Sequence, residues 1–235
     1  MNGRALLGPA AALLALVAAG AADPAGRATM PPPADFVRAV DNPWFPLEPG
    51  TTMIYSGEKD GAPIRQVVRV TSRTKVIQGV RCVVLDDRVY VHGKLEERTN
   101  DWYAQDKHGT VWYLGEATAE LDEQGHVVST EGSWQAGRDG ARAGVYMPAH
   151  PRVSQTFRQE YYPGHAEDFF RIVSMRATVR VPYVTSTHAL QTREWTPLEP
   201  GVVDRKLYVR GIGTVKELTV KGGDERVELV EVRRS

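Results

Sequence analysis

The residues best suited to metal or acid–base chemistry lie between positions 150 and 168. They are His150, Glu160, His165, Glu167 and Asp168. His150 ends a long loop, Glu160 falls in an extended segment, and His165, Glu167 and Asp168 follow a Tyr-Pro-Gly turn. A hairpin would therefore bring Glu160 opposite Glu167 or Asp168. Two imidazoles with one or two carboxylates suit zinc or another divalent ion, and carboxylates alone suit calcium. His150, Glu160, His165 and Glu167 are therefore candidate metal ligands, and solvated or ion-paired side chains are the alternative.

Aromatic side chains form the second candidate group. Tyr103 and Tyr113 flank one turn, as do Trp102 and Trp112 in the outer pairing, so rings are expected on both faces of that hairpin. On a concave sheet these rings would make an apolar pocket with polar tips, and simple core packing is the alternative. The candidate ligand-binding residues are Trp102, Tyr103, Trp112, Tyr113, Trp134, Tyr161 and Trp195.

Other chemistry has little support in the sequence. Ser133 lacks the second glycine of a nucleophile elbow. Cys82 sits in an apolar run, where a small buried side chain is expected rather than a reactive thiol. His92, His108 and His126 fall in or beside turns and are expected to be solvated. No catalytic residue is assigned, and no cofactor is expected beyond the divalent ion considered above.

The elements that would position these residues are short strands. From Thr51 onward, β-branched and aromatic runs alternate with glycine-containing turns, which is typical of hairpins. In residues 66–71, Gln66, Val68 and Val70 face one way and the intervening residues face the other. No segment shows a sustained helical period. The sequence predicts an all-β fold: a single curved antiparallel sheet, half-barrel or barrel, of about 10–13 strands.

Residues 1–22 have the pattern of a secretory signal peptide. Arg4 precedes an apolar, alanine-rich stretch that ends in small residues, and this stretch is too short for a comfortable membrane span. We expect no membrane span after cleavage, and a secreted or periplasmic product. Residues 23–40 are predicted to form a Pro/Ala-rich leader, and residues 41–235 a β-rich domain. A net charge of zero disfavours nucleic acid as a partner.

Two further segments stand out. Residues 132–151 contain several glycines and are predicted to form a long ordered loop. The pattern Trp-x-Pro-Leu-Glu-Pro-Gly occurs at residues 44–50 and again at 195–201. One interpretation is that both segments form the same local turn, in which the prolines keep the chain extended and Pro-Gly turns it into the next strand. The alternative is that they form two edges of the fold, which present Trp44 and Trp195 to one ligand or partner.

Two motifs carry a resemblance to known proteins. The segment DWYAQDKHGTVWYLGE at residues 101–116 resembles a hairpin of uncharacterised exported bacterial β-proteins, and YVRGIGTVK at 208–216 resembles a late hairpin of the same group. That group is similar in shape to half-barrel envelope proteins of the LolA type, which carry lipids or lipoproteins in an apolar concavity. The resemblance covers two short segments and implies a curved antiparallel sheet rather than an activity.

Three functions follow as hypotheses. The first is a secreted, non-enzymatic binding or carrier protein that holds an apolar or amphipathic small molecule, or an envelope component, in an aromatic-lined concavity. The second is a metal-dependent hydrolase that uses His150, His165 and nearby carboxylates. The third is a structural envelope protein that uses the proline-rich leader and the repeated tryptophan motif for interactions.

Overall fold

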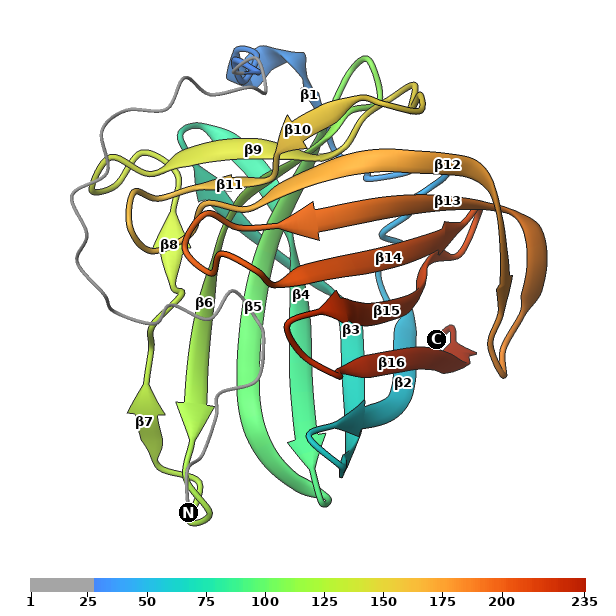
Figure 1. The fold of residues 1–235 in the computed structure, drawn as a ribbon. Helices are drawn as coiled ribbons and strands as arrows, with labels where there is room; N and C mark the ends of the chain where they lie inside the picture. Colours follow the sequence, from blue (N-terminus) through green and yellow to red (C-terminus); the bar gives the residue numbers. More distant parts are fainter. Residues whose placement is uncertain (1–27) are drawn as a thin grey trace.

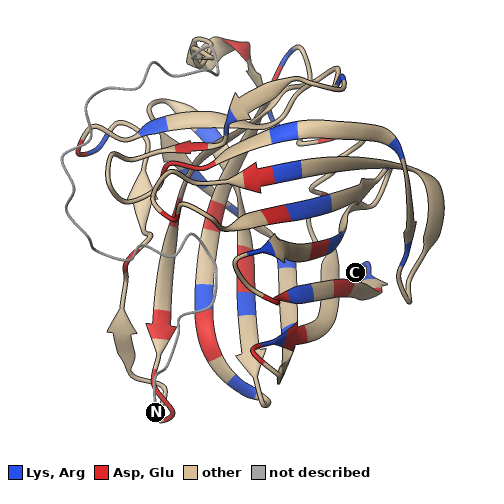
Figure 2. Cartoon of the chain, in the orientation of Figure 1, with Lys and Arg blue, Asp and Glu red and all other residues tan. Residues whose placement is uncertain are grey.

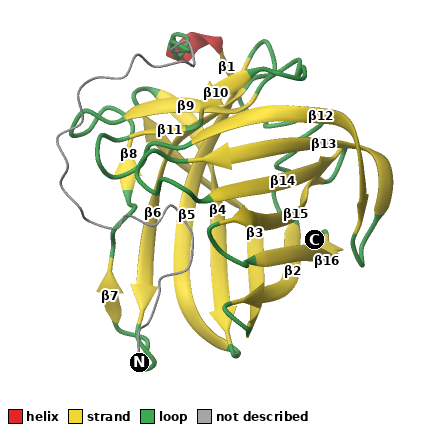
Figure 3. Cartoon of the chain, viewed as in Figure 1, coloured by secondary structure: helices red, strands yellow, loops and turns green. Residues whose placement is uncertain are grey.

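The structure is a computed structural model that describes residues 28–235, and these residues are strands almost throughout (Figures 1 and 3). The expected signal peptide lies outside the described residues, as does the first part of the leader. The described part of the leader contains a short 3-10 helix, η1 (Pro33–Asp35), and a two-residue strand. No helix among the described residues has the length and apolar character needed to cross a membrane.

The strands follow one another through short turns. Their bounds are β1 (Phe36–Val37), β2 (Thr52–Lys59), β3 (Ala62–Ile77), β4 (Val80–Val91), β5 (Lys94–Asp106), β6 (Val111–Leu121), β7 (Val127–Ser129), β8 (Trp134–Gln135), β9 (Arg142–Met147), β10 (Thr156–Arg158), β11 (Glu160–Tyr161), β12 (Phe169–Arg180), β13 (Thr185–Trp195), β14 (Val203–Val209), β15 (Gly213–Lys221) and β16 (Arg226–Arg233).

Within the described residues, thirteen strands form one antiparallel path that bends until it nearly closes into a barrel. The path runs β10-β12-β13-β14-β15-β16-β2-β3-β4-β5-β6-β9-β11, while β1, β7 and β8 pair at its margins. Strands β2–β6 make one wall and β12–β16 make the facing wall (Figure 1). This architecture confirms the predicted all-β class and the single curved antiparallel sheet.

The two ends of the path are neighbours in the chain. Strand β10, at one end of the path, pairs with β12, and β11, at the other end, pairs with β9. Only Gln159 lies between β10 and β11 in the chain. At Gly144 of β9 the backbone approaches so closely that an added Cβ would lie 2.3 Å from the carbonyl oxygen of Gln159. Residues 156–161 therefore bridge both walls at one point, and the remainder of that joint is an unsealed seam. On the other side the ring is completed by pairing of β16 with β2.

The predicted turns are confirmed, and their geometry explains their composition. Three hairpins turn at Asp60-Gly61, Gln78-Gly79 and His92-Gly93, where both residues have positive φ. This is the conformation of the tight turn whose twist matches that of the flanking strands, and glycine adopts it without steric cost.

One expectation for the fold was wrong. The stretch 132–151 is not a single long loop, because it contains β8 and β9. Strand β9 carries the buried run Val145, Tyr146 and Met147 and pairs with β6. Gly144 marks a close approach of backbone, whereas Gly132, Gly137 and Gly140 have positive φ.

Alternation along the strands decides which side chains face the interior. Gln66 and Val68 of β3 lie on one face, as predicted, and this face lines the cavity. Arg69, which was predicted to lie on the other face, is exposed. On β5 the inward positions alternate in the same way. Because the side chains of a strand alternate with period two, one face of each long strand supplies the interior of the barrel. The inward residues of β5 are Glu97, Thr99, Asp101 and Tyr103.

Candidate functional site

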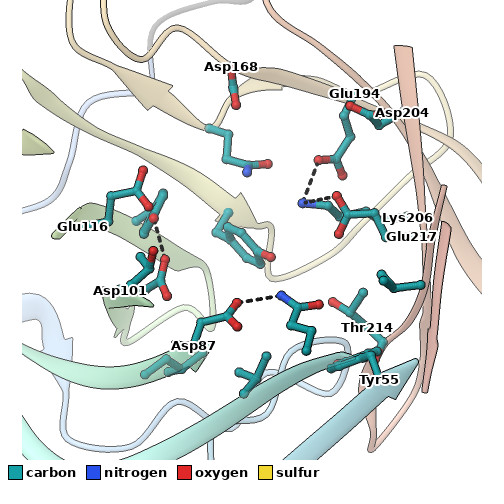
Figure 4. A pocket seen from close by; sticks show the side chains of 18 of the residues that line it. Tyr55, Asp87, Asp101, Glu116, Asp168, Glu194, Asp204, Lys206, Thr214 and Glu217 are labelled. Carbon is teal, nitrogen blue, oxygen red and sulfur yellow. Dashed lines mark hydrogen bonds and ion pairs between the residues drawn. The ribbon is translucent and has the colours of Figure 1, made fainter. Parts of the chain in front are cut away.

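The interior of the barrel contains a cavity of about 230 Å³ (Figure 4). Its wall comes from strands on both sides of the ring and from the segment that follows β13. Trp195 at the end of β13, and Thr196 and Glu199 after it, belong to the second copy of the repeated tryptophan motif. A volume of this size has room for on the order of 20 water molecules. The cavity is therefore large enough for a small organic molecule.

The wall is strongly acidic. Lys206 is the one basic side chain among the described residues that line it, against eleven carboxyl groups. Acidic positions recur on β4–β6 and again on β13–β15 (Figure 2). The carboxyl residues are Asp87, Glu97, Asp101, Glu116, Glu160, Asp168, Glu194, Glu199, Asp204, Glu217 and Glu225.

On the β4–β6 side, Glu116 is the least satisfied carboxyl group. It is 4% exposed and lies directly across the strand pair from Asp101. Its Oε1 accepts no hydrogen bond from any described residue. Burial, followed by repulsion from Glu160 and Asp101, raises the pKa of Glu116 well above its usual range.

The neighbours of Glu116 each have a hydrogen-bond donor. The hydroxyl group of Tyr113 donates to Asp101 Oδ1 at 2.7 Å, and the indole Nε1 of Trp134 donates to Glu160 Oε2 at 2.9 Å. Gln66 Nε2 of β3 donates to Asp87 Oδ2 of β4 at 2.7 Å, while Oδ1 of Asp87 accepts no hydrogen bond from the described residues. Neutral donors thus support this wall, and none of the described residues on β4–β6 that line the cavity is a lysine or an arginine.

The opposite wall carries the lysine. Lys206 Nζ lies 3.3 Å from Glu194 Oε2 and 3.5 Å from Glu217 Oε1 (Figure 4). Burial alone would lower the pKa of Lys206, but the two carboxylates outweigh burial and raise it well above its usual range. The ammonium group is therefore charged and already engaged on its own side of the cavity.

A group of stacked rings completes the site. Phe45, Tyr103, Tyr113 and Tyr146 all line the cavity. Tyr103 and Tyr113 stack with their ring centres 4.6 Å apart, and Tyr146 contacts the ring of Phe45 at 4.4 Å. We call these four residues the aromatic wall. It places apolar ring faces next to the carboxylates of β5 and β6, which suits a guest with an apolar body and a charged end.

The buried carboxyl groups give the protein an unusual expected dependence on pH. Burial raises the pKa of Glu97 and Glu217 to about 7 and that of Asp101 and Asp168 to about 6. Carboxyl groups in an unfolded chain titrate near 4, so between these values the folded protein binds more protons than the unfolded chain. Stability should therefore fall by roughly a few kcal/mol as the pH rises from about 5 to 8.

Thermal unfolding across this pH range checks the expectation. The variant Glu97→Gln should flatten the slope, whereas Glu96→Gln, which changes an exposed carboxylate on the same strand, should leave it unchanged. The carboxylates Asp122 and Glu231 have lowered pKa values. They therefore change the stability only in more acidic solution than this range. A melting temperature that increases steadily from about pH 5 to 8 would contradict the assignment.

The structure brings three of the seven predicted ligand-binding aromatics to the cavity: Tyr103, Tyr113 and Trp195. The other four are placed elsewhere. Trp102 lies beneath the ammonium group of Lys75 at 3.2 Å, and Trp112 donates from Nε1 to Asp106. Trp134 is 4% exposed behind Tyr113, and Tyr161 packs against two arginines. Strand alternation separates them, because neighbours such as Trp102 and Tyr103 must face opposite sides.

The four predicted metal ligands do not converge. His150 is exposed, Glu160 faces the cavity, and His165 contacts Glu131 at 2.9 Å on the surface. Glu167 pairs with Arg158. Among the described residues no group of three or more His, Cys, Asp or Glu side chains has a metal-binding arrangement. The hairpin does bring Glu160 beside Asp168, as the turn at 162–164 indicated, through a bond from Gln159 N to the Asp168 carbonyl at 2.7 Å.

The residues that sequence reasoning missed are the acidic ones within strands. Asp87, Asp101, Glu116 and Glu217 were not singled out, and neither was Lys206. A signal was present, because Glu97, Thr99, Asp101 and Tyr103 share one face of a strand and include two carboxylates. Such a face is costly to bury unless it lines a polar interior.

Comparisons with known proteins give fold-level likeness only. No family model matches the chain, and no curated protein matches it. A solved structure of a candidate exported protein with a YmcC-like fold from Bacteroides fragilis has a TM-score of 0.47 and 15% identity, covering 81% of this chain and 99% of that one. A candidate lipoprotein from Parabacteroides distasonis has a TM-score of 0.45 and 9% identity, covering 81% and 98%. These likenesses identify no functional residue.

Proposed function

We propose that this protein is an exported, non-enzymatic binding or carrier protein that holds one small amphipathic molecule in the barrel cavity. The observation that carries the proposal is the cavity of about 230 Å³ with the aromatic wall on one side and polar groups around it. Binding sites for small molecules are concave, with ring faces for contact area and a few polar groups for orientation. The signal-peptide pattern of residues 1–22 supports export.

The arrangement supports binding more than chemistry. The tyrosines of the aromatic wall have pKa values raised by burial, with Tyr146 at about 12, so they remain neutral hydrogen-bonding groups near neutral pH. The histidines considered as metal ligands, His150 and His165, do not line the cavity. We therefore do not propose the metal-dependent hydrolase.

Filling the cavity should weaken binding strongly. Val89 lies on β4 and lines the cavity, whereas Val76 on β3 is 69% exposed on the outside. Calorimetric titration of the wild-type protein with benzylamine, benzyl alcohol and benzoate should detect one bound molecule of at least one probe. Val89→Phe should weaken that binding by about tenfold or more, because the new ring occupies the space of the guest.

The matched variant Val76→Phe adds the same ring outside the barrel and should bind as the wild type does. Circular dichroism and thermal unfolding of both variants establish that each is folded before titration. The proposal is overturned if folded wild-type protein binds none of the three probes, or if Val89→Phe binds them with unchanged affinity.

A further inference from the structure

The charge of the cavity identifies the class of guest. Resting on the proposed binding function, we infer that the molecule held in the barrel is an organic cation, an aromatic or aliphatic amine whose ammonium group is bound by Glu116 and whose body lies on the aromatic wall. Three observations on the described residues carry this inference: the unpartnered carboxylate oxygen, the distribution of charge, and the spread of the carboxylates.

The unpartnered oxygen is Oε1 of Glu116. Buried polar atoms in folded proteins nearly always have a partner, because an unpaired one has lost its hydrogen bonds to water without replacement. Glu116 is 4% exposed, lines the cavity and receives no hydrogen bond at Oε1 from any described residue. Oδ1 of Asp87, on the same wall, is in the same state. In the ionised carboxylates both atoms are acceptors, so a guest that satisfies them in that state must be a donor.

The distribution of charge makes that donor a cation. Lys206 neutralises part of the opposite wall through Glu194 and Glu217, and the hydroxyl group of Thr192 also donates to Glu194 at 2.7 Å. The β4–β6 wall has no comparable basic partner among the residues that line the cavity. An ammonium group placed there would restore the balance that buried carboxylates require.

The spread of the carboxylates selects an organic cation over a metal ion. A metal ion gathers oxygen ligands at about 2.0–2.6 Å around one point. The described residues contain no group of three or more acidic or histidine side chains arranged in this way. All four residues of the aromatic wall line the cavity, and their apolar surface can cover an apolar body, which a bare ion lacks.

Binding of such a guest is coupled to protons. Glu116 is surrounded by other acidic groups, so it and its neighbours hold protons until a cation replaces them. The titratable groups that face it are Asp101, Glu97 and Tyr103 from β5, Tyr113 from β6, Tyr146 from β9, Glu160 from β11, Asp168 before β12 and Lys206 from β14. An ammonium ligand should therefore bind more tightly as the pH increases.

The experiment compares three probes of similar size and different charge on the full-length protein. At about pH 7.5, benzylamine is expected to bind about tenfold or more tightly than benzyl alcohol, and benzoate should not bind. The affinity for benzylamine should increase between about pH 5 and 8 while that for benzyl alcohol stays constant. Glu116→Gln should reduce the preference for benzylamine by about tenfold and weaken its pH dependence, whereas Glu96→Gln should change neither.

The outcomes separate the two proposals. If none of the probes binds, the binding function itself fails. If benzyl alcohol or benzoate binds as tightly as benzylamine, the cavity binds small molecules and only the assignment of a cation is overturned. If calcium chloride displaces benzylamine at equal concentration, the cation is a metal ion and the organic class is wrong. Retention of full preference in folded Glu116→Gln would remove Glu116 as the anchoring residue.

Discussion

Replacing Lys206 with methionine is expected to destabilise the protein by about 3–5 kcal/mol at about pH 8 and by much less at about pH 5. The ammonium group lies 3.3 Å from Glu194 and 3.5 Å from Glu217 in the barrel interior. Removing it leaves two buried carboxylates without their cation. At lower pH Glu217 can take up a proton, because burial already raises its pKa to about 7, and the loss of stability is then smaller.

Chemical unfolding at both pH values measures this effect. The matched control is Lys216→Met on the neighbouring strand, where Lys216 pairs with Glu228 at 2.8 Å. That pair lies at the partly exposed outer face, so its loss should cost about 1 kcal/mol or less at either pH. Equal losses for the two variants, or a loss at Lys206 that does not depend on pH, would show that the lysine does not neutralise the interior.

Replacing Asp106 with alanine is expected to cost about 3 kcal/mol through loss of a buried turn. Asp106 is 5% exposed at the end of β5. Its Oδ1 accepts hydrogen bonds from the backbone N of His108 at 2.9 Å and of Thr110 at 3.1 Å, and its Oδ2 accepts from Trp112 Nε1 at 2.9 Å. Alanine would leave the buried indole donor and two backbone donors without these acceptors.

A second turn in the same protein supplies the control. Asp122 accepts hydrogen bonds from the backbone N of Gln124 and His126, which repeats the spacing of the turn at Asp106. That turn is at the surface and holds no tryptophan, so Asp122→Ala should cost only about 1 kcal/mol. Urea unfolding of both variants compares them directly. Similar losses would mean that the turn backbone, rather than the buried contact to Trp112, is what Asp106 stabilises.

The fold was readable from the sequence because its signals are local. Glycine-containing pairs such as Asp60-Gly61 indicate hairpin turns, and both residues of this pair have positive φ in the structure. Alternation between Gln66 and Val70 indicates a strand with one buried face. Strand β9 was not predicted because Gly144 lowers the β propensity of its segment. Glycine is required at this position because the backbone of residues 156–161 lies too close for a side chain. Local patterns do not report such contacts between distant segments.

The site was only partly readable for a related reason. Tyr103 and Tyr113 were found because aromatic residues flanking a turn are conspicuous, and they do stack in the cavity. Carboxylates in strands usually indicate solvated faces, so the burial of Asp101 and Glu116 could not be predicted from their residue type. Whether two polar faces meet across an interior depends on ring closure, which places Lys206 on the same cavity as Asp101 and Glu116. His150 and His165 were proposed as metal ligands from their residue type alone, and the structure places both at the surface in or beside turns.

The pairing of β2 with β16 has a consequence for how the molecule is made. These two strands lie near opposite ends of the described chain, and their ladder is the step that encloses the interior. Bringing such distant segments together is entropically costly, so this ladder should form late. During synthesis the strands from β2 to β15 emerge first, and the acidic interior stays wet until the last strand arrives. The nascent barrel thus avoids burying unneutralised charge before Lys206 and its partners are all in place.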